Sequence, residues 1–167
     1  MAKNDDMPSE VADATFRAFV RASGLVRRLM EPFFAKFGIS GAQWGVLRAL
    51  GGAQDDGEPG LRLTDIGDRL LIRPPSVTGV IDRLERMGLV ERTSSAQDMR
   101  AKHVRLTPAG RQLFGRVKED RKAKVSDILG GLTPKEQSDL NVLLRRLGGH
   151  LELLGGHEIS ASADSKE

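Results

Sequence analysis

The chain has 167 residues and 39% hydrophobic content, which fits one domain with a sizeable core and excludes disordered, collagen-like and fibrous proteins. It contains no cysteine, which excludes disulfide frameworks, thiolate metal sites, cysteine nucleophiles and thiol redox sensors. The 26 Lys and Arg against 23 Asp and Glu give a net charge of +3, which permits a polyanionic partner without requiring one.

A long amphipathic helix is predicted near the start of the chain. Between Val11 and Phe37, apolar residues recur with a helical period, and five of the six phenylalanines lie in this stretch. Pro32 has no backbone N–H, so we expect a kink near Met30 that divides the stretch into two helical pieces. Gly38 is expected to end it.

The next helix is predicted from a capping-box pattern. Ser40 and Gln43 have the spacing in which each side chain satisfies the backbone N–H of the other residue. The helix that follows places Trp44 on its buried side, and residues 51–60 have the composition of a loop.

A helix-turn-helix is predicted in the middle of the chain. Residues 61–63 can form only a very short strand, and Thr64 is expected to cap a brief helix. A second helix begins at the prolines of residues 73–75 and ends at Gly88. The residues expected on the inner faces are Leu63, Ile66, Leu70, Leu71, Val77, Val80, Ile81, Leu84 and Met87.

A two-stranded hairpin and two more helices complete the pattern. Residues 89–93 and 102–106 are predicted strands with a polar turn between them, since apolar and polar residues alternate in the second strand. Thr107 is expected to cap a helix that runs toward Leu129.

The last helix carries a leucine stripe. Thr133 and Glu136 form a second capping box, with Pro134 at the first helical position. The stripe is expected to end near Gly155–Gly156, with a disordered tail from residue 157. Such a stripe can pack in the core of a monomer or form a dimer interface.

A helix-turn-helix followed by a hairpin is a winged helix, which most often binds DNA because an α-helix fits the major groove. The expected fold class is therefore mainly α with a small β-hairpin. The candidate DNA contacts on the second helix and just before it are Arg73, Pro75, Ser76, Thr78, Gly79 and Arg83. In the hairpin turn, Asp98 can orient Arg100 for entry into a minor groove. In the alternative interpretation, Ser76 only caps the helix and the arginines are solvated surface charges.

Four stretches form a specific ordered pattern, which continues as VRLTPAG at residues 104–110. They are AQWGVL at 42–47, LTDI at 63–66, SVTGVIDRLERMGLV at 76–90 and DMRA at 98–101. Through them, residues 39–110 resemble the MarR family of bacterial winged-helix regulators.

The resemblance implies a homodimer that binds double-stranded DNA at a pseudo-palindromic operator. We expect a repressor, because a bound dimer can exclude polymerase without any added contact surface, although the residues do not exclude activation. It places Ser76, Thr78 and Gly79 at base-reading or phosphate positions, Arg83 at a backbone-contacting or supporting position, and Arg100 at the tip of the wing. The chain departs from the family at residues 73–75, where many members have serine-rich sequence, and at Met99, where a basic residue is frequent. These departures make the operator sequence unpredictable.

The resemblance also implies a small anionic aromatic or phenolic effector, bound between the dimerisation and DNA-binding regions, that lowers DNA affinity. The nearest candidate residues are Phe37, Trp44, Arg27 and Arg28. Core packing of the two aromatic residues and solvation of the two arginines are the alternative.

The expected organisation has four segments: an N-terminal dimerisation helix (1–38), a winged helix-turn-helix domain (39–110), linking and C-terminal dimerisation helices (111–156) and a tail (157–167).

The three histidines lack metal-ligand spacing, and no nucleophile elbow or phosphate-binding loop is present, so no enzyme, metal or cofactor is expected. No apolar run approaches the ~20 residues that span a bilayer, and residues 1–10 lack a secretory signal. We expect a cytoplasmic protein, associated with the nucleoid when bound to DNA. A winged-helix module that binds protein is the alternative function.

Overall fold

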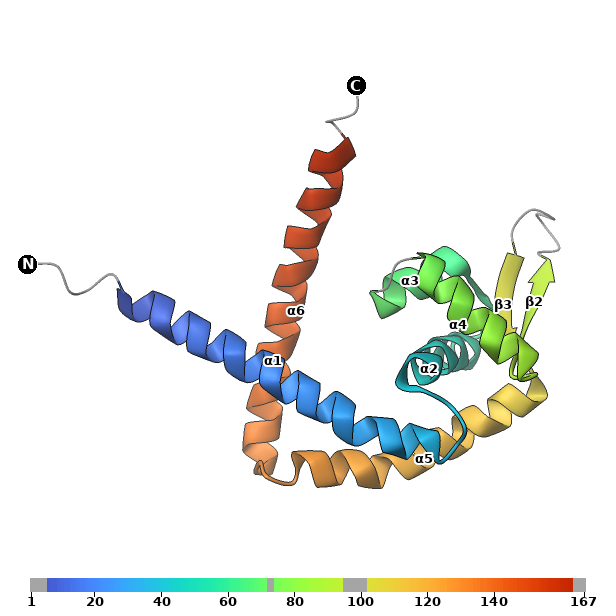
Figure 1. The fold of residues 1–167 in the computed structure, drawn as a ribbon, viewed down its shortest axis with the longest axis horizontal. Helices are drawn as coiled ribbons and strands as arrows, with labels where there is room; N and C mark the ends of the chain where they lie inside the picture. Colours follow the sequence, from blue (N-terminus) through green and yellow to red (C-terminus); the bar gives the residue numbers. More distant parts are fainter. Residues whose placement is uncertain (1–5, 72–73, 95–101, 164–167) are drawn as a thin grey trace, which may run out of the picture. The chain divides into compact units, whose positions relative to one another are not determined.

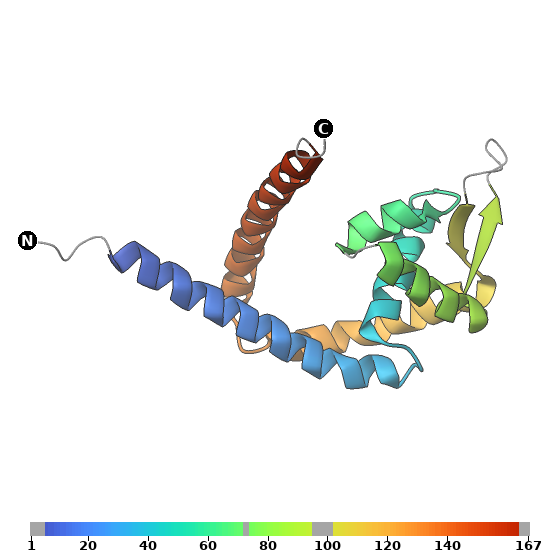
Figure 2. The same cartoon turned by 45° about the horizontal axis from the view of Figure 1, so that its top comes forward.

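The structure, a computed structural model, describes residues 6–71, 74–94 and 102–163. Two compact units, residues 1–121 and 122–167, are described separately below. In the described ranges the chain is mainly helical with one small antiparallel sheet, which confirms the predicted fold class (Figures 1 and 2).

The first helix, α1, runs from Asp6 to Ala35 as one continuous element. The prediction of two helical pieces is therefore wrong. Pro32 lies three residues before the end of α1, where a missing backbone N–H removes only one helical hydrogen bond. Gly38 ends the helix as expected, with a φ of +72°, and the N–H of Ile39 donates to the carbonyl oxygen of Phe34 at 3.3 Å.

Only the last part of α1 is buried in its own unit. Met30, Phe33 and Phe34 belong to the core, whereas Phe16 is 65% exposed. The other exposed apolar side chains of the helix are Val11, Phe19, Val20, Leu25, Val26 and Leu29. The apolar face upstream of Met30 thus has no cover from the described part of its own unit.

The second helix, α2 (Gly41–Asp55), begins with the predicted capping box. The N–H of Ser40 donates to Oε1 of Gln43 at 2.8 Å, and the N–H of Gln43 donates to the Ser40 hydroxyl at 3.3 Å. Trp44 is buried and stacks between Phe34 and Phe114, with ring centroids 5.9 Å and 5.8 Å apart. The stack joins α1, α2 and the start of α5 (Pro108–Leu129) in one core.

The helix-turn-helix consists of α3 (Leu63–Leu70) and α4 (Pro74–Arg86). The prediction that Thr64 caps α3 is wrong, because Arg62 is the N-cap and its N–H donates to the carboxylate of Asp65 at 3.1 Å. Leu71 is not on the inner face either. It ends α3 in the left-handed conformation with a φ of +53°, and its side chain is 84% exposed.

The core of the helix-turn-helix is formed by fully buried apolar residues at helical spacing. Ile66 of α3 and Val77, Ile81 and Leu84 of α4 are all 0% exposed. Met87, predicted to be buried, is 44% exposed because α4 ends at Arg86, one residue earlier.

The sheet has three strands in the order β1-β3-β2, all antiparallel. The predicted hairpin is formed by β2 (Val90–Ser94) and β3 (Lys102–Leu106). Its description as two-stranded is incomplete, because β1 (Leu61–Arg62) pairs with the other edge of β3, with Leu61 opposite Val104. The inner face of the sheet carries Val90, Val104 and Leu106, all buried.

The unit of residues 122–167 contains the end of α5 and the last helix, α6 (Pro134–Ala163). Both the N–H and the hydroxyl of Thr133 donate to the Glu136 carboxylate at 2.8 Å, which confirms the predicted cap. The helix continues past Gly155–Gly156 to Ala163, so the predicted helix end is wrong. A glycine inside a helix costs only about 1 kcal/mol relative to alanine.

The leucine stripe of α6 is exposed within its unit. Among its members, Leu147 is 39% exposed and Leu143 is 61% exposed. The remaining members are Leu140, Leu144, Leu151 and Leu154. The second unit therefore also has an apolar helix face without cover of its own.

Candidate nucleic-acid interface

The outer face of α4 carries the polar and small residues that the sequence singles out. Ser76, Thr78 and Arg83 are exposed, on the side away from buried Val77 and Ile81. Gly79 lies on the same helix, and a side chain there would meet no atom within 4 Å. An α-helix with this surface can approach base edges closely at Gly79 and donate hydrogen bonds on either side of it.

The other predicted DNA contacts are only partly described by the structure. Pro75 lies in the first turn of α4, but its side chain falls outside the described residues. Arg73, between the two helices, also lies outside them, as do Asp98 and Arg100 of the hairpin turn. The structure thus brings together the part of the predicted site that lies on α4.

Arg83 is available for an external anion. Among the residues that the structure describes, its guanidinium has no ion pair or hydrogen bond. Arg86, one turn later, donates from Nε to the backbone oxygen of Asp82 at 3.3 Å. A free guanidinium on an exposed helix face is suited to a phosphate oxygen.

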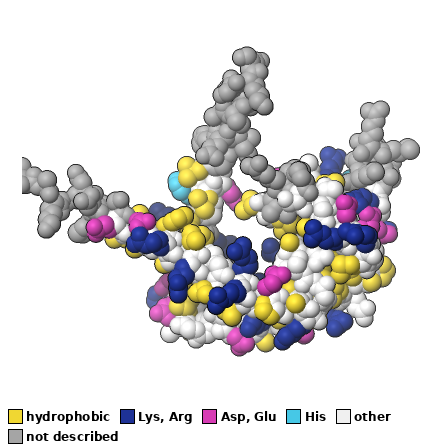
Figure 3. Space-filling view, in the orientation of Figure 1, with side chains coloured by type: hydrophobic (Ala, Val, Ile, Leu, Met, Phe, Trp, Pro, Cys, Tyr) yellow, Lys and Arg dark blue, Asp and Glu magenta, His cyan; other side chains and the backbone are white. Residues whose placement is uncertain are grey.

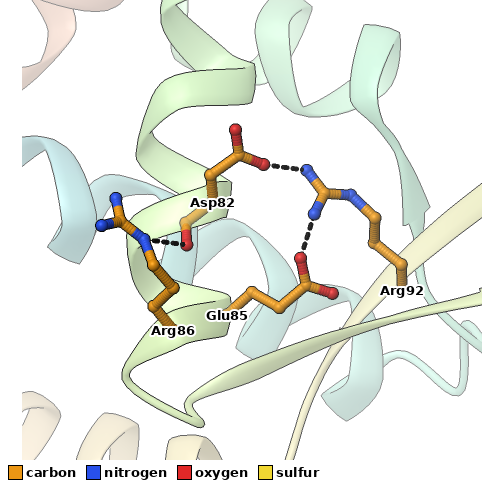
Figure 4. Close-up of polar contacts among 4 residues, drawn as sticks. All are labelled: Asp82, Glu85, Arg86 and Arg92. Atoms are coloured by element: carbon orange, nitrogen blue, oxygen red, sulfur yellow. Dashed lines mark hydrogen bonds and ion pairs between the residues drawn. The ribbon is translucent and has the colours of Figure 1, made fainter.

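Two carboxylates also lie on α4, and an arginine from the sheet holds both. Arg92 of β2 donates from Nη2 to Oδ1 of Asp82 at 2.5 Å and from Nη1 to Oε2 of Glu85 (Figure 4). The hydrogen bond to Asp82, followed by the nearby charges of Glu85 and Asp82, raises the pKa of the Arg92 guanidinium. Figure 3 shows basic and acidic side chains side by side over this part of the molecule.

Arg92 was not among the residues predicted from the sequence, although a signal for it exists. In the β2–β3 register Arg92 stands opposite Val104, which is fully buried, so it occupies an inward-facing position of the strand. A charged residue at such a position needs a partner of opposite charge. Asp82 and Glu85 of α4 precede Arg92 by ten and seven positions and supply that charge.

Two of the four residues predicted to bind a ligand line one hollow, and the other two pack against aromatic rings. Trp44 is enclosed in the aromatic stack, and Phe37 packs edge-on against Phe33 at 5.3 Å. Arg27 and Arg28 instead line a shallow hollow of about 610 Å³ along one face of α1. The rest of its lining consists of Gly24, Glu31, Pro32 and Ala35.

The described ranges, 6–71, 74–94 and 102–163, contain no group of three or more His, Asp or Glu side chains placed to hold a metal ion. No helix among them has the length and apolar character that crossing a bilayer requires.

Residues 37–101, which include α2, the helix-turn-helix and β2, match a family model described as the MarR family. The HTH-type transcriptional regulator PecS of Dickeya dadantii is 30% identical over 132 residues, which cover 78% of each chain. An HTH-type transcriptional regulator of Bacillus subtilis, YkoM, is 36% identical over 93 residues, or 56% of this chain and 60% of that relative.

Solved structures resemble the chain over most of its length. The complex of MepR from S. aureus with DNA has a TM-score of 0.70 and 25% identity, covering 80% of this chain and 96% of that one. BpsR of Bordetella bronchiseptica, whose DNA binding is regulated by 6-hydroxynicotinic acid, has a TM-score of 0.64 and 27% identity. The latter match covers 83% of this chain and 98% of BpsR.

Proposed function

The chain belongs to the MarR family of winged-helix transcriptional regulators, and on this premise we propose that it acts as a homodimeric repressor at a pseudo-palindromic operator. Its recognition element is α4, inserted into the major groove of double-stranded DNA. The observation that carries the proposal is the division of α4 into two faces. Val77, Ile81 and Leu84 are fully buried, while Ser76, Thr78 and Arg83 are exposed.

The contacts follow from the chemistry of each side chain. Ser76 and Thr78 hydrogen-bond to base edges or phosphates, and Gly79 lets the helix backbone approach closely. Arg83 neutralises a phosphate. The wing adds Arg100, oriented by Asp98, in the adjacent minor groove, and Arg73 and Pro75 contact DNA at the start of α4.

Dimerisation explains the two uncovered apolar faces. The exposed side chains of α1 upstream of Met30 and the leucine stripe of α6 leave large apolar surfaces on their respective units. A second copy of the chain supplies matching surfaces, as an isologous interface requires. Residues 1–38 and 111–156 thus form the dimerisation region, and residues 39–110 form the DNA-binding domain.

Regulation by a small anionic aromatic effector extends this proposal. Support comes from BpsR, a structural relative whose DNA binding responds to an aromatic carboxylic acid. The hollow of about 610 Å³ that Arg27 and Arg28 line on α1 presents two exposed guanidinium groups for such an anion. Trp44 is buried and stacked on two rings, and half-buried Phe37 packs against Phe33, so we place the effector at the two arginines and not at these aromatic rings.

A regulator of this kind acts in the bacterial cytoplasm, on the nucleoid, and we assign it no catalytic activity. Fluorescence anisotropy tests the proposal, with purified protein, labelled DNA from directly upstream of its own gene and a shuffled copy, across a salt series. Tight, salt-sensitive binding that prefers the native fragment is the expected result. Equal affinity for both fragments would refute sequence-specific regulation and favour a winged helix with a protein partner.

A further inference from the structure

Arg92 occupies a position where its strand would ordinarily place an apolar side chain. It is on the inner face of β2, two residues after buried Val90 and opposite buried Val104. Its side chain is 23% exposed, whereas the side chain of Arg105, on the outer face of the sheet, is 48% exposed. A partly buried guanidinium on the inner face is energetically acceptable only with charged partners.

Both partners of Arg92 belong to α4. The two terminal nitrogens of its guanidinium each donate to a different carboxylate, Asp82 and Glu85, which are three residues apart and share one side of the helix (Figure 4). A single side chain of the sheet therefore holds two carboxylates of the helix at once. The geometry is that of a bridge between the base of the hairpin and α4.

The position of these carboxylates has a consequence for DNA binding. They lie on the same helix as Arg83, whose guanidinium has no partner among the described residues, and they carry the same charge sign as phosphate. Without a counter-charge they would repel the DNA backbone or attract the arginines of α4 away from it. In specific binding α4 lies against the base edges, whereas in non-specific binding it stays farther from the DNA, along the backbone. The repulsion would therefore lower the affinity for specific DNA more than the affinity for non-specific DNA.

We propose that Arg92 is a positioning residue for DNA recognition, which neutralises and holds Asp82 and Glu85 so that α4 can enter the major groove, without itself touching DNA. The inference rests on the proposed function. It differs from an ordinary phosphate contact, because Arg92 should matter only while both carboxylates are present.

The test compares four proteins by anisotropy with the native upstream fragment and its shuffled copy. They are the wild type, Arg92→Gln, the triple variant Arg92→Gln/Asp82→Asn/Glu85→Gln, and Arg105→Gln as a matched control. The control breaks the ion pair of Arg105 with Glu91 on the outer face of the same sheet, where Nε and Oε1 are 2.7 Å apart. Circular dichroism verifies that each variant is folded.

The quantity compared is the ratio of affinities for native and shuffled DNA. Arg92→Gln should lower this ratio about tenfold, and the triple variant should return to within about threefold of the wild type, as expected for groups that act as a coupled unit. Arg105→Gln should change the ratio by less than about twofold, since exposed pairs contribute little. The salt dependence of the triple variant should equal that of the wild type, because no phosphate contact is lost.

Four results would overturn the inference. An unchanged ratio in Arg92→Gln would show that the bridge has no role in recognition, and a triple variant as weak as Arg92→Gln would show that Arg92 acts on DNA directly. If Arg92→Gln does not fold, Arg92→Lys replaces it, because lysine keeps the charge but can reach only one of the two carboxylates. The affinity ratio of Arg92→Lys should then lie between those of the wild type and of a protein without the bridge. A wild-type ratio in Arg92→Lys would count against the bridge. A wild-type protein with no preference for native DNA would instead refute the proposed function, and the inference with it.

Discussion

Gly110 packs so closely against Leu89 that a Cβ atom at residue 110 would lie 1.9 Å from the carbonyl oxygen of Leu89. The two residues join the first turn of α5 to the loop that follows α4, where the hydroxyl of Thr107 also donates to the carbonyl oxygen of Gly88 at 2.6 Å. Gly110→Ala should therefore lower the free energy of unfolding by about 2 kcal/mol, because the clash is with backbone and cannot be relieved by a rotamer change. Urea denaturation followed by circular dichroism measures it.

Gly115 provides the matched control on the same helix. It is exposed, and a Cβ atom there would meet nothing within 4 Å. Gly115→Ala should raise the free energy of unfolding by about 0.5 to 1 kcal/mol through helix propensity alone. Equal effects of the two substitutions would contradict the close packing at Gly110.

Arg83→Ala should weaken the affinity for native and shuffled DNA by similar factors. The reason is that a phosphate contact carries no sequence information, and losing it should reduce the slope of log affinity against log salt by about one. Arg69→Ala is the control, because Arg69 is paired with Glu58 at 3.0 Å. A wild-type salt slope in Arg83→Ala would show that the guanidinium does not reach DNA.

Leu147→Asp should convert the dimer to a monomer and abolish operator binding, because it places a charge in the leucine stripe of α6. Sedimentation velocity gives the oligomeric state directly. Ser138→Asp is the control on the same helix, since nine residues at 3.6 per turn put Ser138 on the side opposite Leu147. A dimeric Leu147→Asp protein would exclude the stripe from the interface.

The acid stability of the last helix should depend on Glu136. The N–H and hydroxyl of Thr133 donate to its carboxylate and hold the pKa of Glu136 below its ordinary value of 4.5. A lowered pKa stabilises the fold at pH values above 4.5, and that contribution is lost as the pH falls through the folded-state pKa. Thermal unfolding of Glu136→Gln should show a lower midpoint than the wild type at neutral pH, and the difference should shrink at about pH 3. A constant difference would mean that the charge of Glu136 is not involved.

Leu71 is a position where a substitution should stabilise the protein. A left-handed conformation costs a residue with a Cβ atom about 1 to 2 kcal/mol, and the side chain of Leu71 is 84% exposed, so it contributes little packing. Leu71→Asn should raise the unfolding free energy by about 0.5 kcal/mol, because asparagine adopts this conformation more readily. Leu71→Ala retains the strain and should give no gain, so equal effects of the two would contradict this account.

Local sequence signals predicted several helix starts and stops. The capping boxes at Ser40 and Thr133 and the stop at Gly88 depend on residues near in the chain, and the structure confirms them. Helical periodicity likewise identified Val77 and Ile81 as core residues.

Features that depend on distant residues were missed. The pairing of β1 with β3 joins Leu61 to Val104 across more than forty positions, and no local pattern reports it. The partners of Arg92 lie on a different element, so the strand pattern alone showed a charged residue without indicating what satisfies it. In the candidate site, the outward face of α4 could be predicted from the helical period. Ser76, Thr78 and Arg83 stand at positions next to the core residues in the sequence but off the buried face.

The stack of Phe34, Trp44 and Phe114 gives the protein an optical reporter. Trp44 is the only tryptophan and the chain has no tyrosine, so its near-ultraviolet emission comes from one indole. That indole is enclosed where α1, α2 and α5 meet. A blue-shifted emission maximum in the native protein, moving to the red on unfolding, would follow the integrity of this junction without any label. A binding event that loosens the stack would register in the same signal.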